Sequence, residues 1–293
     1  MSELAPPIVD VAELPDGGRL LFGEWPGGGT PLVAIHGLTN QHRNLAGVAA
    51  ALAGERRVVA PDLRGRGGSS AAPDPSTIDG HARDVLALMD AVGVPRAILA
   101  GHSMGAYVAV ALAGRAPERV AGAVLIDGGV MLAADVEAIV ASVRPLLGRL
   151  TTSYPSPEAY VAEWEGRGIF DGHWGPVVRA NLGYDLGRRR DGYVPKADPR
   201  AALDDLRDIA ATGHRDRLAA LACPVLAITA EGGMAPGGPP VIGEAELAVL
   251  RAEVADLEVV GVPGTGHHTV TISDRGAAAC AAAIRPFAAR LGD

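Results

Sequence analysis

Gly101-His102-Ser103-Met104-Gly105, a match to the pattern G-x-S-x-G, is the strongest indication of how this chain folds. An apolar run, Ala97-Ile98-Leu99-Ala100, comes directly before it, and a helical pattern over residues 104–115 follows directly. A sharp turn from strand to helix needs small residues on either side of the central position, and it presents that central side chain above the edge of a sheet. The sequence therefore predicts that Ser103 stands at such a turn in an α/β fold.

Short apolar runs alternate with amphipathic segments on both sides of this turn. Each run has the length of a buried strand, and this alternation is typical of a mostly parallel, doubly wound sheet with helices on both faces. The expected strands are residues 32–35, 57–60, 97–100, 120–126, 224–229 and 257–262, and the expected helices are residues 44–53, 78–92, 104–115 and 274–291.

The alternation stops after Gly129 and resumes near residue 224. Between these points the sequence has helical segments joined by loops rich in Pro, Gly and Arg, and it has no clear buried strand. We therefore predict one α/β core, residues 1–132 and 215–293, with a helical cap, residues 133–214. The cap is inserted after the strand of residues 120–126, which corresponds to the sixth main strand of the fold.

The charge balance argues against nucleic acid as a partner. The 293 residues include 26 basic and 34 acidic side chains, a formal net charge of −8, which opposes binding to a polyanion. Only one of the basic residues is a lysine, Lys196, so lysine chemistry has a single candidate. The two cysteines, Cys223 and Cys280, fit no metal-ligand spacing, and we expect no metal.

The N-terminus and the hydropathy indicate a cytoplasmic protein. Residues 1–11 lack the basic and apolar regions of a signal peptide, and no run approaches the roughly 18 consecutive apolar residues that span a bilayer. We expect no membrane association and a small molecule as the binding partner. The sequence does not indicate an oligomeric state.

A serine hydroxyl acts as a nucleophile at neutral pH only with a base, itself held by a third group. His267 follows Gly264-Thr265-Gly266, between the last apolar run and the last helix. This loop lies at the carboxyl edge of the sheet, where Ser103 is also expected. His267 is therefore the predicted base, in preference to its neighbour His268, which we expect to pack or to face solvent.

In their order and spacing, these motifs make the chain resemble the α/β-hydrolase superfamily, in its branch with a serine nucleophile and a helical cap. The resemblance rests on the turn at Ser103, the pair His36-Gly37 after an early strand, residues 62–69 (Asp-Leu-Arg-Gly-Arg-Gly-Gly-Ser), and the Gly-His loop at His267. Relatives often have histidine where Arg66 stands, and we expect this difference to be structural.

The resemblance also implies an oxyanion hole and no cofactor. The backbone N–H groups of Leu38 and Met104 are the implied donors to the developing oxyanion. Chemistry of this kind needs neither a metal nor an organic cofactor.

The acid of the implied triad is left open between two carboxylates. Family members commonly carry an aspartate in the loop after the seventh main strand, but here that loop, residues 230–234, reads Ala-Glu-Gly-Gly-Met. Asp127 ends the sixth strand, where haloalkane dehalogenases and zearalenone lactonases carry their acid as a glutamate. We predict Asp127 as the acid, with Glu231 as the alternative, and both preserve the chain order of serine, acid and histidine.

The serine nucleophile favours acyl chemistry. Epoxide hydrolases and haloalkane dehalogenases of this fold use an aspartate at the position of Ser103. We predict a serine hydrolase of the esterase or lactonase type, cleaving a carboxylic ester or lactone of a bulky apolar or aromatic small molecule through an acyl-enzyme. A C–C bond hydrolase or a cofactor-free haloperoxidase with the same triad is an alternative, and a ligand receptor of the same fold is a further alternative that is not an enzyme.

Aromatic side chains are scarce but unevenly placed, since seven of the 11 fall within residues 133–214. A small cap needs large side chains for its own core, but it must also cover Ser103. We therefore predict that some of Tyr160, Trp164 and Trp174 line an apolar substrate pocket. His36 and His102, beside the functional backbone, are expected to form local hydrogen bonds rather than to act in catalysis, and both are candidates to line the same site.

Overall fold

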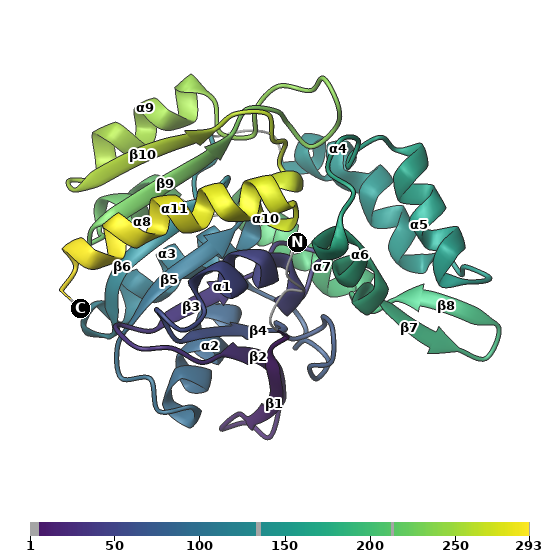
Figure 1. Cartoon of the computed structure of the whole chain (residues 1–293), viewed down its shortest axis with the longest axis horizontal. Coiled ribbons are helices and arrows are strands. Elements are labelled where there is room, and N and C mark those ends of the chain that lie inside the picture. Colours follow the sequence, from purple (N-terminus) through teal and green to yellow (C-terminus); the bar gives the residue numbers. More distant parts are fainter. Residues whose placement is uncertain (1–5, 133–135, 212–213, 293) are drawn as a thin grey trace.

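The computed structural model describes residues 6–132, 136–211 and 214–292. Its main sheet is built from β1 (Ile8–Glu13), β2 (Arg19–Trp25), β3 (Leu32–Ile35), β4 (Val58–Pro61), β5 (Ala97–His102), β6 (Val120–Ile126), β9 (Val225–Ala230) and β10 (Leu257–Val262). These eight strands follow the spatial order β1-β2-β4-β3-β5-β6-β9-β10 (Figure 1). β2 pairs antiparallel with both β1 and β4, and all other neighbours are parallel. The predicted mostly parallel α/β fold is confirmed.

The first two strands were not predicted from the sequence. β1 is an edge strand that pairs only with β2, and Ile8, Val9 and Val11 on it are each about half exposed. A search for continuous apolar runs finds buried parallel strands, whereas an exposed antiparallel edge strand lacks such a run.

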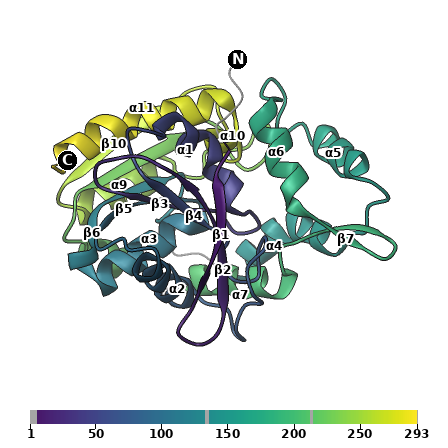
Figure 2. The same ribbon diagram turned by 60° about the horizontal axis from the view of Figure 1, so that its bottom comes forward.

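Helices cover both faces of the sheet (Figure 1 and Figure 2). The 3₁₀ helix η1 (His42–Leu45), α1 (Ala46–Leu52), α10 (Thr269–Ile272) and α11 (Asp274–Arg290) lie on one face. α2 (Ile78–Ala91), α3 (Met104–Arg115), the 3₁₀ helix η2 (Pro117–Arg119), α8 (His214–Ala219) and α9 (Glu244–Glu253) belong to the other side of the sheet.

Each buried strand contributes side chains to the apolar clusters on both faces of the sheet, because successive side chains of a strand point to opposite faces. Leu99 on β5 is buried in the apolar cluster beneath α3, while its neighbours Ile98 and Ala100 belong to the cluster beneath α1 and α11. This double burial explains why the parallel strands are continuous apolar runs, and it holds the carboxyl ends of β3, β5 and β6 at one rigid edge.

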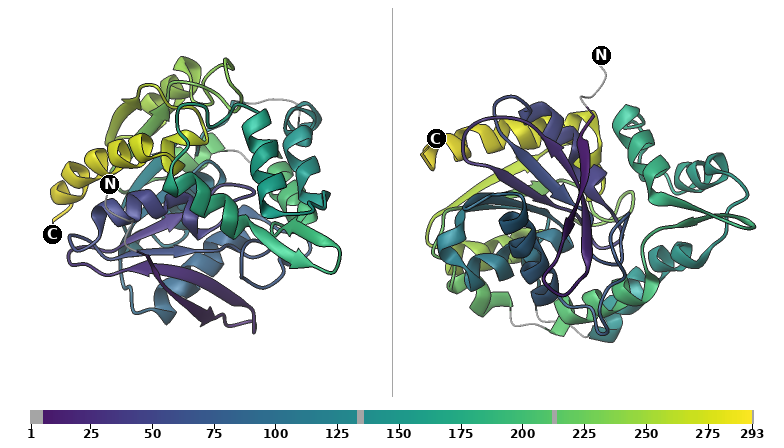
Figure 3. Two further views of the ribbon diagram at one scale, coloured as in Figure 1. Left: turned by 45° about the vertical axis from the view of Figure 1, so that its right-hand side comes forward. Right: turned by 90° about the horizontal axis from the view of Figure 1, so that it is seen from below.

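The cap follows β6 and is described over residues 136–211. It consists of α4 (Val136–Gly148), the 3₁₀ helix η3 (Arg149–Thr151), α5 (Pro157–Gly166), α6 (Pro176–Asp185), β7 (Leu186–Arg189), β8 (Gly192–Pro195) and α7 (Pro199–Ala211). Figure 2 and Figure 3 show these elements gathered on one side of the sheet.

The cap also contains two short strands, which the search for buried strands did not find. β7 and β8 form an antiparallel hairpin, and Arg188 and Arg189 on it are exposed. A polar hairpin with little burial lacks the apolar run by which the buried strands were recognised. The first predicted cap residue, 133, lies outside the described residues, and residue 214 begins α8, which packs on α3 and α9.

A buried ion pair ties the cap to the core. The Arg66 guanidinium comes from the loop after β4, and its Nη2 donates to Asp205 Oδ2 on α7 at 2.6 Å, with both side chains fully buried. His81 Nε2 on α2 lies 3.0 Å from the same carboxylate oxygen. The structural role expected for Arg66 is thus consistent with its contacts.

None of the helices in the three described ranges is both long and apolar enough to cross a membrane.

We expect removal of the Asp205 carboxylate to destabilise the protein. Burial alone raises the pKa of this carboxyl, but the neighbouring His81 and Arg66 outweigh burial and hold the pKa well below its usual range. Asp205→Ala would leave Arg66 buried without its counter-ion, at a cost of about 3 to 5 kcal/mol in the free energy of unfolding, measured by urea denaturation. Because the pKa is lowered in the folded state, this contribution is complete above the ordinary aspartate pKa of about 3.9 and decreases only at lower pH.

The matched control is Asp204→Ala, one residue earlier on α7. Asp204 pairs with Arg200, which is 40% exposed, so its loss should cost less than about 1 kcal/mol. Equal destabilisation by the two substitutions would contradict the importance assigned to the buried pair.

Candidate active site

Ser103 occupies a strained turn between β5 and α3. Its backbone has φ 54°, a left-handed value that a non-glycine residue rarely adopts. Two close approaches explain the flanking glycines: a Cβ at position 101 would lie 2.1 Å from the Gly105 carbonyl oxygen, and a Cβ at position 105 would lie 2.1 Å from the Ile35 carbonyl oxygen. The G-x-S-x-G pattern is therefore a steric requirement of this turn.

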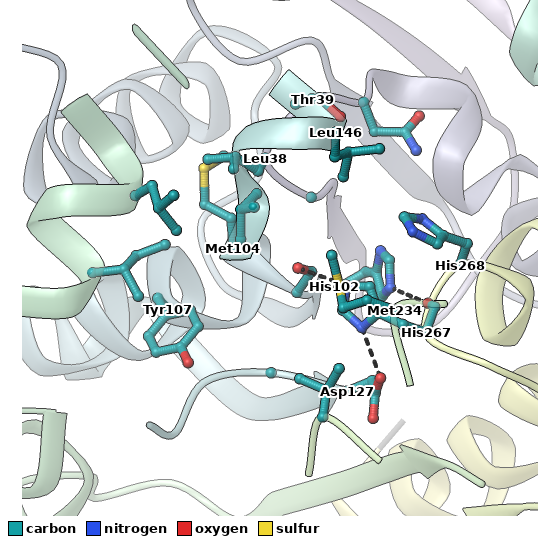
Figure 4. A pocket seen from close by; sticks show the side chains of 18 of the residues that line it. Leu38, Thr39, His102, Met104, Tyr107, Asp127, Leu146, Met234, His267 and His268 are labelled. Atoms are coloured by element: carbon teal, nitrogen blue, oxygen red, sulfur yellow. Dashed lines mark hydrogen bonds and ion pairs between the residues drawn. The ribbon is translucent and has the colours of Figure 1, made fainter. Parts of the chain in front are cut away.

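The structure brings Ser103, His267 and Asp127 together in one hydrogen-bonded chain. Ser103 Oγ lies 3.0 Å from His267 Nε2, and His267 Nδ1 lies 2.7 Å from Asp127 Oδ2 (Figure 4). Asp127 is fully buried and His267 is only 3% exposed. An acceptor at Nδ1 requires that nitrogen to carry the proton, which leaves Nε2 free to accept the proton of the serine hydroxyl.

Asp127 is fixed by its own backbone and by a second hydrogen bond. Its φ is 47°, and its other carboxylate oxygen, Oδ1, accepts the Ala230 N–H at 3.1 Å. Two hydrogen bonds to separate oxygens hold the carboxylate plane toward the imidazole.

Glu231, the alternative acid, lies elsewhere. It is exposed, and its Oε2 accepts the Gly264 N–H at 2.5 Å. Gly264 belongs to the turn before His267, so Glu231 contacts the loop that carries the histidine and not the imidazole itself.

His102 supports the loop from behind. Its Nε2 donates to the His267 carbonyl oxygen at 2.8 Å, and its Nδ1 lies 3.0 Å from Asn44 Oδ1. Burial, followed by the nearby His267, holds the pKa of His102 well below its usual range. His102 also lines the cavity above Ser103, as predicted.

Leu38 and Met104 carry the two backbone N–H groups that are predicted to bind the oxyanion. Leu38 and Met104 both line the cavity beside Ser103. Met104 is the first residue of α3, so its N–H has no acceptor within the helix. Within the described part of the chain the Leu38 N–H makes no hydrogen bond, and the Leu38 carbonyl accepts from Arg66 Nε at 3.0 Å. Arg66 thus orients the peptide beside one predicted oxyanion donor.

His36 makes the local hydrogen bonds that were expected of it, but it does not line the cavity. It is fully buried beneath the site: Nδ1 donates to the Gly37 carbonyl at 2.7 Å, and Nε2 accepts the Leu63 N–H at 2.9 Å. Burial lowers the pKa of His36 to about 3, which keeps this neutral tautomer. His36 joins two loops of the core and is not among the cavity-lining residues.

A cavity of about 280 Å³ opens above Ser103. Tyr107 and Met131 line it from the core side, and the cap contributes an aliphatic wall (Figure 4). The wall consists of Ile139, Val143 and Leu146 on α4 and Leu206 and Ile209 on α7. Thr39, Asn40 and His268 supply polar groups.

The cap aromatics are not where the sequence suggested. Tyr160, Trp164 and Phe170 form the buried core of the cap, with Trp174 packed against them, and none of the four is among the cavity-lining residues. The prediction that Tyr160, Trp164 or Trp174 lines the pocket is therefore corrected. The physical reason is that these large side chains stabilise the cap itself.

The aliphatic wall was missed, although a signal for it exists. Ala202, Leu206 and Ile209 recur at helical spacing on α7, so one face of this helix is apolar. Such a face predicts burial, but it does not say whether the face covers a core or a cavity.

Comparisons with known proteins agree with the fold. A family model described as alpha/beta hydrolase fold matches residues 30–158. The crystal structure of E-2-(acetamidomethylene)succinate hydrolase superposes with a TM-score of 0.82 at 23% sequence identity, covering 96% of this chain and 98% of that chain. At this identity the likeness shows the shared fold alone.

Curated relatives match only part of the chain. The dihydrolipoyllysine-residue acetyltransferase component of the acetoin cleaving system from Pseudomonas putida is 47% identical over 112 residues, 38% of this chain and 30% of that protein. The 3-hydroxybutyrate-oligomer hydrolase of Cupriavidus necator is 35% identical over 119 residues, 39% of this chain and 41% of that protein. The chain therefore matches less than half the length of these relatives, and hydrolases are among them.

We expect a fluorophosphonate probe to label Ser103, because the hydrogen-bonded His267 activates its hydroxyl. Ser103→Ala should abolish labelling, measured by intact-protein mass spectrometry. Asp127→Asn should slow the rate of labelling by about 10⁴, because the imidazole would lose its orienting carboxylate.

Glu231→Gln is the matched comparison, since it removes a carboxylate that does not touch the imidazole. It should change the labelling rate less than about tenfold, far below the loss expected when a triad acid is removed. A larger loss in Glu231→Gln than in Asp127→Asn would reverse the assignment of the acid.

Proposed function

We propose that this chain, a member of the α/β-hydrolase superfamily, is a serine hydrolase that cleaves a carboxylic ester or lactone of an apolar small molecule. The single observation that carries the proposal is the hydrogen-bonded chain of Ser103, His267 and Asp127 beneath a largely apolar cavity. The hydrolases among the similar proteins support the reaction class.

The geometry supports an acyl-enzyme mechanism. Ser103 Oγ attacks the substrate carbonyl carbon while His267 Nε2 accepts the hydroxyl proton, and Asp127 stabilises the imidazolium that forms. The Leu38 and Met104 N–H groups donate to the tetrahedral oxyanion, a contribution of about 10² to 10³ in rate per donor. His267 then protonates the leaving oxygen, and in the second half it activates the water that releases the acid.

The cavity favours a medium-sized, uncharged acyl group. Its volume of about 280 Å³ is roughly twice the 150 Å³ that holds a benzene molecule in an engineered protein cavity. No lysine or arginine is among the described residues that line it, so a carboxylate on the acyl group would be desolvated without a counter-ion. The aliphatic wall thus points to an alkyl or aryl acyl group.

The test is hydrolysis of p-nitrophenyl esters of increasing acyl length. We expect hexanoate to exceed acetate in kcat/KM, since each buried methylene contributes about 0.8 kcal/mol. Val143→Phe should reduce the cavity and lower kcat/KM for hexanoate by about tenfold while acetate is less affected. Arg189→Ala, on the exposed hairpin, is the matched control and should leave both unchanged.

Two results would overturn the proposal. Hydrolysis that survives Ser103→Ala would exclude the serine as nucleophile. Turnover below about one per hour across esters and lactones, compared with a typical kcat of about 1 to 10³ per second, together with tight ligand binding, would favour a receptor of the same fold.

A further inference from the structure

A second cavity adjoins the first at the predicted base. Its volume is about 310 Å³, and it lies between the loop after β9, residues 232–237, and the cap loop of residues 168–173. Met234, His267 and His268 line both cavities. The predicted catalytic imidazole therefore borders both cavities.

His268 has unused hydrogen-bonding capacity at this junction. Its Nε2 is buried and has no hydrogen-bond partner among the described residues. The ring lies edge-on to the cap aromatics, with centroids 6.1 Å from Trp164 and 6.5 Å from Phe170. Figure 4 shows it turned toward the cavity, on the opposite side from Tyr107. A buried polar atom without a partner is uncommon in folded proteins, and a ligand would supply the missing bond.

His268 is a neutral group. Burial, together with the neighbouring His267 and Arg149, lowers the pKa of His268 to about 3. A neutral imidazole donates from one nitrogen and accepts at the other, and it attracts no anion by charge. The partner that fits is an uncharged hydroxyl or amide.

The proposed mechanism indicates which half of the substrate, the acyl group or the leaving group, lies beside His268. His267 Nε2 must protonate the leaving oxygen, so the leaving group departs beside this imidazole. The ring centroids of His267 and His268 are 5.3 Å apart. The aliphatic wall of α4 and α7 suits the acyl half, which leaves the second cavity for the leaving group.

We propose that the second cavity binds the leaving-group half of the substrate, and that His268 selects an alcohol bearing an uncharged hydrogen-bonding group. This inference rests on the proposed hydrolase function. The second cavity also disfavours an anionic alcohol, because its described lining residues include one carboxylate, Asp171, and neither lysine nor arginine.

The test compares 3-hydroxypropyl hexanoate with butyl hexanoate, two esters that differ by a hydroxyl in place of a methyl group. The wild type should prefer the hydroxyl ester by about three- to tenfold in kcat/KM, the range for one neutral hydrogen bond. His268→Phe, which keeps the ring packing, should reduce this ratio to about one, and His268→Gln should restore part of it. Arg189→Ala should leave the ratio unchanged.

Ala235→Trp tests the location of the leaving group. Ala235 lines only the second cavity, so a large side chain there should lower kcat/KM for both esters at least about fivefold while methyl hexanoate is hydrolysed normally. Equal hydrolysis of all three esters by this variant would place the leaving group elsewhere and overturn the proposal.

Measurements of ester binding test the role of His268 independently of the proposed hydrolase function. In the Ser103→Ala background, calorimetry should show tighter binding of the hydroxyl ester than of the butyl ester, and His268→Phe should remove the difference. If the wild type hydrolyses neither ester but this binding difference is present, the hydrolase function fails and the role of His268 stands. A hydroxyl preference that is absent, or that survives His268→Phe, overturns the inference whether or not the esters are hydrolysed.

Discussion

The close passage of the backbone through the turn at Ser103 is the constraint on which the site depends. The chain leaves β5 after His102, reverses at a positive φ at Ser103, and enters α3 so close to β3 that there is no room for a Cβ at position 105. Strain of this kind persists only where the surrounding structure holds it, and here β3, β5 and β6 are buried on both faces. The serine is therefore rigid before a substrate arrives.

The acid is held by the same arrangement one strand further along. The Ser103 N–H donates to the Ile126 carbonyl at 2.9 Å, and a Cβ at position 128 would lie 2.4 Å from the Ser103 carbonyl oxygen. Asp127 thus lies in a backbone segment that packs directly on the nucleophile turn. An acid at the end of β6 is placed by two adjacent parallel strands, whereas Glu231 at the end of β9 is one strand further away and hydrogen-bonds the histidine loop instead.

Local steric and burial constraints decide which parts of the fold and of the site could be predicted from the sequence. The parallel strands, the turn at Ser103 and the loop at His267 could be predicted, because backbone sterics and double burial leave local patterns. The exposed strand β1 and the polar hairpin of the cap leave none. The cavity wall could not be assigned either, because Leu206 and Ile209 have the same helical spacing whether they cover a core or a substrate. Only the packing of the cap against the core distinguishes the two.

In the cap, aromatic side chains form the buried core and aliphatic side chains line the cavity, whereas the sequence analysis assigned both roles to the aromatic residues. The aromatic cluster, with Trp164 and Phe170, forms the buried core of the cap, and the aliphatic faces of α4 and α7 line the cavity above Ser103. The cluster still influences the site through His268, whose ring contacts both aromatics and lines both cavities. The Nε2 atom of this imidazole is buried and has no hydrogen-bond partner among the described residues. In the role proposed for His268, the aromatic core of the cap contributes to substrate selection by positioning one polar atom.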